Sequence, residues 1–105
     1  VRQHMQRIKD EFHGSGTIRG GLLLLRPNDA LRLVQRCCEQ DIKVLGVDGF
    51  ILTACTTQPS MEQSIDLSDL EGIRNPVNCW ERAEVFLKER ETTDLFFEVV
   101  LDERQ

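Results

Sequence analysis

Residues 22–52 read LLLLRPNDALRLVQRCCEQDIKVLGVDGFIL, and the predicted fold rests on this stretch. Its apolar start, residues 22–25, is short and ends before a proline, which predicts a buried strand. Asn28 is a favourable N-cap, and apolar residues then recur at helical spacing, so we expect a helix over 28–40. The apolar residues of 42–52 predict a second strand.

A strand, a helix and another apolar strand predict a βαβ unit with a right-handed crossover and parallel strands. Around this unit we expect an N-terminal helix over 2–12 within an N-terminal segment, 1–16. Further elements are a helix over 76–91 and a final strand over 95–101. In this strand Phe97, Val99 and Leu101 alternate with Glu98 and Asp102, which predicts one apolar and one solvated face. Such a strand is expected at a sheet edge, or in a sheet that helices cover on one side only. The predicted fold class is α+β: a single small domain over 1–105, with a mixed sheet of three to five strands and helices mainly on one face.

The segment KVLGVDGF, residues 43–50, interrupts an apolar run with one charged residue, Asp48, between Gly46 and Gly49. Two interpretations remain open. The glycines mark a bulge or a close backbone approach inside one long strand, or they belong to a hairpin between two short strands. Under either interpretation we expect the Asp48 carboxylate at a turn or bulge that a partner can contact.

Residues 53–74 are polar and form a long connection for so small a domain. Loops of this length are usually functional or mobile. We expect a short helical turn near residues 68–72, capped by Ser68 or Asp66. The loop is therefore a candidate functional segment.

Charge is distributed unevenly along the chain, whose formal net charge is −5. Residues 1–26 carry five basic and two acidic side chains, whereas residues 27–105 carry eight and sixteen. No basic residue occurs between Lys43 and Arg74. The acidic residues of this interval are Asp48, Glu62, Asp66, Asp69 and Glu71. Such a stretch repels a phosphate backbone, so we expect no nucleic-acid partner, whereas a basic protein would be attracted. A solvated acidic loop without a partner is the alternative.

The cysteines show no CxxC pair and no spacing typical of a zinc site. They are Cys37, Cys38, Cys55 and Cys79. We expect reduced thiols in the core, because a free cysteine behaves as a small hydrophobe. The sequence therefore predicts neither a metal site nor a cofactor.

No apolar run approaches the roughly 20 residues that cross a bilayer, and no leader sequence is recognisable. We therefore expect a cytoplasmic protein that does not bind membranes. Residues 1–4 have a second interpretation as a cloning remnant, because His4-Met5 is the dipeptide that a common cloning site encodes.

Trp80 is the single tryptophan and is expected in the first turn of the helix over 76–91. Its spacing with the apolar residues that follow favours a place in the core. Tryptophan is also enriched at interface hot spots, so Trp80 joins the five acidic residues as a candidate partner-binding residue.

The segments ALRLVQRCCEQ (30–40), IKVLGVDGF (42–50), CWERAEVFL (79–87) and LFFEVVL (95–101) occur in an order that resembles small bacterial immunity proteins of polymorphic-toxin systems. The resemblance rests on element order, on a strand that ends in a Gly-x-Asp-like turn, and on a later helix that opens at tryptophan. It covers residues 20–101 and leaves the first helix outside.

Such families are not enzymes: they bind and block a cognate toxin, often a basic nuclease, through an acidic surface. The resemblance implies that Asp48 and the acidic residues at 62, 66, 69 and 71 face the toxin. The segment from Glu62 to Glu71 matches no motif of the family, which leaves those contacts without support from the resemblance.

Two other functions remain open. A ligand-binding or regulatory domain would have an enclosed apolar pocket between the sheet and the 53–74 loop. An enzyme would use Asp48 with His13, which would then lie within hydrogen-bond reach of each other or share one bridging water. Homodimerisation through the apolar strand 95–101 is compatible with all three functions.

Overall fold

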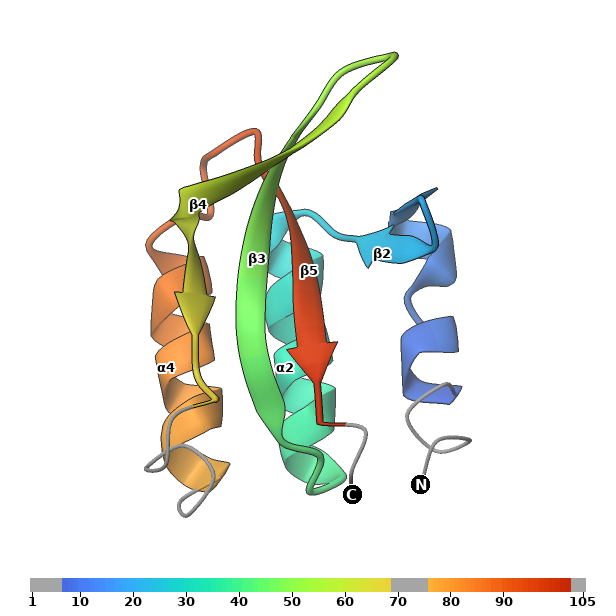
Figure 1. The fold of residues 1–105 in the computed structure, drawn as a ribbon. Coiled ribbons are helices and arrows are strands. Elements are labelled where there is room, and N and C mark those ends of the chain that lie inside the picture. The colour runs from blue at the N-terminus through green and yellow to red at the C-terminus, as the bar shows by residue number, and fades with distance from the viewer. Residues whose placement is uncertain (1–6, 69–75, 103–105) are drawn as a thin grey trace.

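The computed structural model describes residues 7–68 and 76–102, and it confirms the predicted α+β class. In chain order the elements are the 3-10 helix η1 (His13–Ser15), β1 (Thr17–Arg19), β2 (Leu22–Leu24), α2 (Pro27–Glu39), β3 (Val44–Leu52), β4 (Thr57–Asp66), α4 (Pro76–Lys88) and β5 (Phe96–Leu101) (Figure 1). The predicted helix over 28–40 and the predicted strand over 95–101 each match an observed element to within one residue at each end.

The strands form a three-stranded sheet in the order β4-β3-β5 and a separate hairpin of β1 and β2. All of these pairs are antiparallel, so the predicted mixed sheet with two paired parallel strands is not formed. The strand–helix–strand order is present, but β5 lies between its two strands. Phe97 of β5 pairs with Gly49 of β3 on one side and with Leu25, directly after β2, on the other. In a simple βαβ unit the two parallel strands would be neighbours. Here the last strand of the chain, β5, lies between them and pairs on both sides.

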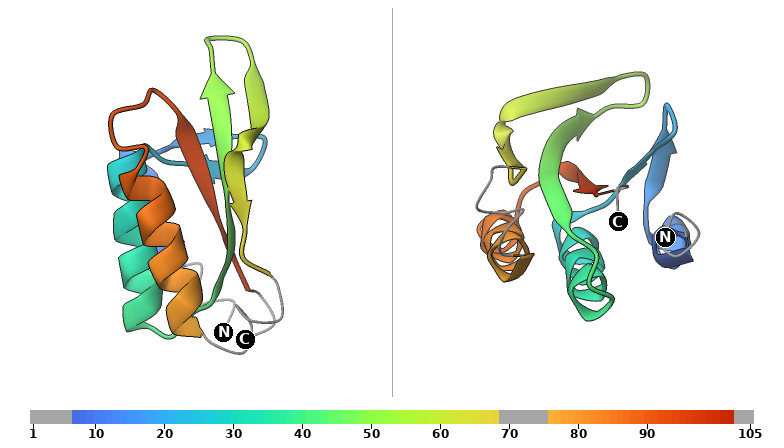
Figure 2. Two further views of the ribbon diagram at one scale, coloured as in Figure 1. Left: turned by 90° about the vertical axis from the view of Figure 1, so that its left-hand side faces the viewer. Right: turned by 60° about the horizontal axis from the view of Figure 1, so that its bottom comes forward.

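Helices α2 and α4 pack side by side against one face of the three-stranded sheet, as predicted, and leave much of the other face open (Figure 2). The amphipathic pattern of each helix explains this arrangement, because its apolar stripe must be buried against another element. Phe86 of α4 meets Phe97 of β5 edge to face, with ring centroids 5.9 Å apart. The Trp80 indole N–H donates to the carbonyl oxygen of Ile42 at 2.9 Å, so this buried polar group is satisfied.

The prediction of a polar loop over 53–74 is wrong for residues 57–66, because Thr57–Asp66 forms β4. The pairing of β3 with β4 shifts register between Val47 and Gly49, where residues 61–64 of β4 face a single residue of β3. The Ser64 hydroxyl accepts a hydrogen bond from the Gly49 N–H and donates one to the Ser60 carbonyl, which closes this wide bulge. KVLGVDGF therefore lies within one long strand with irregular pairing, and the alternative hairpin is not observed.

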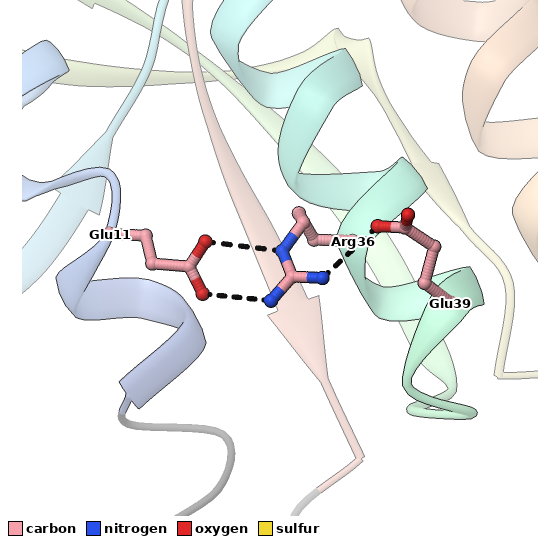
Figure 3. Close-up of polar contacts among 3 residues, drawn as sticks. All are labelled: Glu11, Arg36 and Glu39. Carbon is pink, nitrogen blue, oxygen red and sulfur yellow. Dashed lines mark hydrogen bonds and ion pairs between the residues drawn. The ribbon is translucent and has the colours of Figure 1, made fainter.

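The N-terminal segment contacts α2 through an ion pair and packs two apolar side chains into the core. Residues 7–10 are helical, and the rest of the helix predicted over 2–12 lies partly outside the described residues. Ile8 and Phe12 are buried in the core. The Arg36 guanidinium donates to both carboxylate oxygens of Glu11, at 3.1 and 3.0 Å, and to Glu39 of its own helix at 3.1 Å (Figure 3). This geometry is the bidentate pairing that arginine favours with carboxylates.

The apolar strand suggested for homodimerisation is not a free surface. Phe97, Val99 and Leu101 point into the core, and Leu25 and Phe97 exchange backbone hydrogen bonds of 2.8 and 2.7 Å on the outer edge of β5. Asp102, expected on the wet face, is buried. The edge of β5 is therefore partly occupied by the chain itself.

The expectation of core thiols is right for two of the four cysteines. Cys37 and Cys79 are buried, and Cys38 and Cys55 are exposed; all four are free. Burial raises the pKa of the Cys37 thiol to about 12, so it stays protonated at neutral pH and behaves as a small apolar side chain.

Candidate functional site

The open face of the sheet carries an acidic pair at its centre. Asp48 of β3 and Glu98 of β5 are direct cross-strand partners. Their chain neighbours Val47 and Val99 belong to the core beneath the helices. Because side chains alternate along a strand, the two carboxylates project to the opposite, open face. Both are half-buried rather than fully solvated.

The electrostatics of this pair are unfavourable when both groups are ionised. Partial burial and the charge of Asp66 raise the pKa of Asp48. Partial burial and the charge of Asp48 raise the pKa of Glu98, and Lys9 opposes this shift. Asp66 behaves differently, because hydrogen bonds from the Ser68 hydroxyl and N–H lower its pKa. Asp66 therefore stays charged beside Asp48, so this face holds three neighbouring carboxylates.

Two further predicted partner-binding residues lie on β4, and two lie outside the described residues. Asp66 is exposed at the end of the strand and pairs in register with Gly46. Glu62 is exposed in the wide bulge, next to Met61, whose side chain is 87% exposed. Asp69 and Glu71, with most of the helical turn predicted near 68–72, fall outside the described residues. The structure thus gathers Asp48, Asp66 and Glu98 into one group, here called the acidic patch, with Glu62 on a protruding bulge of the same hairpin.

Trp80 does not belong to this surface. It is 6% exposed, it packs in the core, and its N–H bonds to the backbone of Ile42. The interpretation of Trp80 as a core residue is therefore confirmed, and its assignment as a partner-binding residue is wrong. Helical spacing gave the correct signal, and the general preference of tryptophan for interfaces gave the wrong one.

The two residues of the proposed catalytic pair are not in direct contact. Asp48 faces Glu98 and Asp66, whereas the His13 imidazole lies 3.5 Å from the Asp10 carboxylate in the N-terminal segment. Within residues 7–68 and 76–102, Asp48 and His13 share no direct hydrogen bond or ion pair. The base that an enzyme of this kind needs beside its carboxylate is therefore not in direct contact with it.

A cavity of about 250 Å³ lies at the outer edge of β5, on the other side of that strand from β3 and the 53–68 segment. Its walls come from four parts of the chain: Lys9 and His13 of the N-terminal segment, Leu23 of β2, Leu33 of α2, and Glu98 of β5. This cavity therefore does not lie between the sheet and residues 53–68, the part of the predicted 53–74 loop that the structure describes. Beside β4 there is a shallower apolar groove.

Glu98 is the residue that sequence reasoning missed. Alternation along residues 95–101 placed it on the wet face of a strand, which is correct. Nothing in the sequence indicated that it would lie opposite Asp48, because that pairing joins strands 50 residues apart and depends on the register of β5 against β3. Glu98 also lies outside the interval between Lys43 and Arg74, in which no basic residue occurs, so the acidic residues of that interval did not include it.

A comparison with models of known protein families gave no match, and no characterised protein sequence matches the chain. Among the helices of the described residues, none has both the length and the apolar character needed to cross a membrane. The functional interpretation therefore rests on the geometry of the site and on the resemblance in element order.

Proposed function

We propose that the chain is a non-enzymatic binding protein that neutralises a basic protein partner, as an immunity protein neutralises its toxin, through the acidic patch on the open face of the sheet. The observation that carries the proposal is the placement of Asp48 directly opposite Glu98, with Asp66 beside Asp48. Like charges directly opposite on neighbouring strands destabilise a sheet. A cationic side chain of a partner, placed over the pair, would remove that repulsion.

The neighbourhood of the patch also fits a protein partner. Among the described elements no helix covers this face of the sheet, and the hairpin of β3 and β4 projects beyond the other described helices and strands (Figure 1). Met61 and Glu62 on its bulge combine an exposed apolar side chain with a charge. Methionine adapts its shape to a partner surface, so the bulge supplies apolar contact while the acidic patch supplies charge.

The mechanism would be steric occlusion assisted by electrostatic steering. A field of one sign accelerates the encounter with an oppositely charged protein. Added salt screens that field, with a Debye length of about 8 Å at physiological ionic strength. The association rate should therefore fall steeply with salt, whereas dissociation depends on the contacts that form after docking.

The test is a pull-down with the purified chain from a lysate of its source organism, at low and at moderate salt. We compare the wild-type chain with Asp48→Lys, which places a positive charge in the acidic patch. The matched control is Glu91→Lys, because Glu91 is an exposed acid beyond the end of α4 and the change in net charge is identical. All three proteins are first compared by thermal unfolding, so that a loss of fold is recognised.

The proposal expects a basic protein that is retained at low salt by the wild type and by Glu91→Lys and is lost with Asp48→Lys. Purified, that protein should associate more slowly as salt rises. Equal retention by Asp48→Lys would place the contact elsewhere on the molecule. The absence of any retained protein, from a lysate in which candidate toxins are expressed, would remove the support for a toxin-blocking role.

A further inference from the structure

The cavity at the outer edge of β5 combines Glu98, which the protein-binding proposal also uses, with Lys9 and His13, which it does not use. It lies where the N-terminal segment, the β1–β2 hairpin and α2 meet the edge of the sheet. In Figure 1 the N-terminal segment and the hairpin stand beside β5, on the side away from β3 and β4. The site is thus assembled from segments far apart in sequence.

Groups of opposite charge line the cavity. The ammonium of Lys9 comes from the N-terminal segment and the carboxylate of Glu98 comes from β5. The imidazole of His13, which lies 3.5 Å from the Asp10 carboxylate, adds a hydrogen-bonding group. Lys9 is close enough to Glu98 to act on its pKa, yet burial and the charge of Asp48 outweigh that effect. The carboxylate of Glu98 is therefore partly desolvated, with Asp48 and Lys9 as charged neighbours of opposite sign. A ligand cation at this point would find a partly desolvated acceptor, where an ion pair is worth more than in water.

The remainder of the lining is mainly aliphatic. Ile18, Leu23, Leu33 and Val99 contribute side chains to the cavity walls. Polar and aliphatic groups thus share the lining, and polar groups in a ligand site fix the orientation of the ligand. The volume of about 250 Å³ exceeds the roughly 150 Å³ of an engineered cavity that holds benzene, and it is below the usual range for drug-sized ligands. The fitting ligand is therefore small.

We propose that this cavity binds a small zwitterion with an aliphatic body, of the class of a free branched-chain α-amino acid. The ammonium group would lie at Glu98, the carboxylate at Lys9 and His13, and the aliphatic chain among Leu23, Leu33 and Val99. A simple aliphatic anion would satisfy Lys9 but would be repelled by Glu98. A simple aliphatic amine would satisfy Glu98 but would be repelled by Lys9. Only a ligand with both charges matches both walls.

The proposal is tested by calorimetric titration of the complete chain with four probes. These are L-leucine, 4-methylpentanoate without the amine, 3-methylbutylamine without the carboxylate, and glycine without the aliphatic body. We expect saturable binding of L-leucine, and binding weaker by about tenfold or more for each of the other three, because each lacks a charge-assisted contact or the apolar burial. The comparison uses the wild-type protein alone and does not depend on a variant that folds.

Two variants then assign the charges. Lys9→Met keeps the length of the side chain and removes the ammonium group, and Glu98→Gln keeps the shape and removes the charge. Each should weaken L-leucine binding about tenfold or more, whereas Lys88→Met, an exposed lysine on α4, should leave it unchanged. Absence of saturable L-leucine binding at millimolar concentration would overturn the proposal. Binding that is equal for L-leucine and 4-methylpentanoate, or unchanged in Lys9→Met and Glu98→Gln, would overturn the assignment of a zwitterion.

Discussion

The two faces of the three-stranded sheet use neighbouring residues for opposite purposes. Val47 and Phe97 point beneath the helices and are fully buried. The next residues along the same strands are Asp48 and Glu98. They point to the open face and form a half-buried pair of like charges. The covered face contributes stability through apolar burial. The open face lowers stability through repulsion, and it offers the charge that a partner or ligand can use.

This difference implies that single substitutions can change stability and binding separately, according to the face of the sheet on which the residue lies. A substitution on the covered face should change unfolding strongly and binding only through loss of fold. A substitution on the open face should change binding and have a small effect on unfolding, with the opposite sign. The following changes test this separation, in order of decreasing effect on the free energy of unfolding.

Phe97→Ala should have the largest effect. The Phe97 side chain is 0% exposed and packs edge to face against Phe86. Its removal leaves a cavity beneath two helices, so we expect a loss of about 3–5 kcal/mol in the free energy of unfolding, measured by urea denaturation. The control is the neighbour Phe96→Ala on the half-buried open side, where Arg26 lies 5.1 Å from the ring centre. That variant should lose about 1 kcal/mol, and equal losses would contradict the division into two faces.

Gly49→Ala should have an intermediate effect, because it acts where the bulge of β4 crosses β3. A Cβ atom at Gly49 would overlap the backbone oxygen of Gln63, and the backbone cannot move without disturbing the Ser64 hydrogen bond. We expect a loss of about 1–3 kcal/mol in unfolding free energy, measured by thermal and urea unfolding. Gly14→Ala is the control, since a Cβ there meets open space, and its stability should stay within about 0.5 kcal/mol of wild type.

Asp48→Asn should have the smallest effect, and it should be stabilising. The pKa of Asp48 and that of Glu98 are raised in the folded protein, so ionisation penalises the folded state at neutral pH. Removal of one charge should therefore add about 0.2–1 kcal/mol to the unfolding free energy at pH 7, a range that allows for solvent screening.

The advantage of Asp48→Asn over wild type should depend on pH in a defined direction. A raised carboxylate pKa means that the penalty is fully present above the raised value and is relieved as the pH falls through it toward the ordinary range. The stability difference between the two proteins, measured by thermal unfolding from pH 7 to pH 4, should thus shrink as acid is added. A difference that grows with acid would mean that Asp48 has a stabilising cation near it in solution.

The local pattern of the chain determined a good part of the fold. The apolar stripe and the polar residues on the other side predicted α2 to within a residue at each end, because amphipathicity is a local property. The N-cap predicted at Asn28 is wrong: the helix begins at Pro27, and its N-cap position, Arg26, makes no side-chain capping bond. Alternation in residues 95–101 placed Phe97, Val99 and Leu101 inside and Glu98 outside for the same reason. The spacing of Trp80 with its apolar neighbours likewise favoured the core position that the structure has.

The tertiary structure alone decided which strands pair and in which register. The chain segment Thr57–Asp66 is too polar to be recognised as a strand by its own composition, and it becomes one because β3 offers an open edge. The insertion of β5 between Leu25 and β3, and the meeting of Asp48 with Glu98, are contacts between residues distant in sequence. Strand pairing depends on cross-strand packing and on the burial of one whole face, so no local pattern encodes it. The acidic patch and the cavity beside β5 both follow from that pairing.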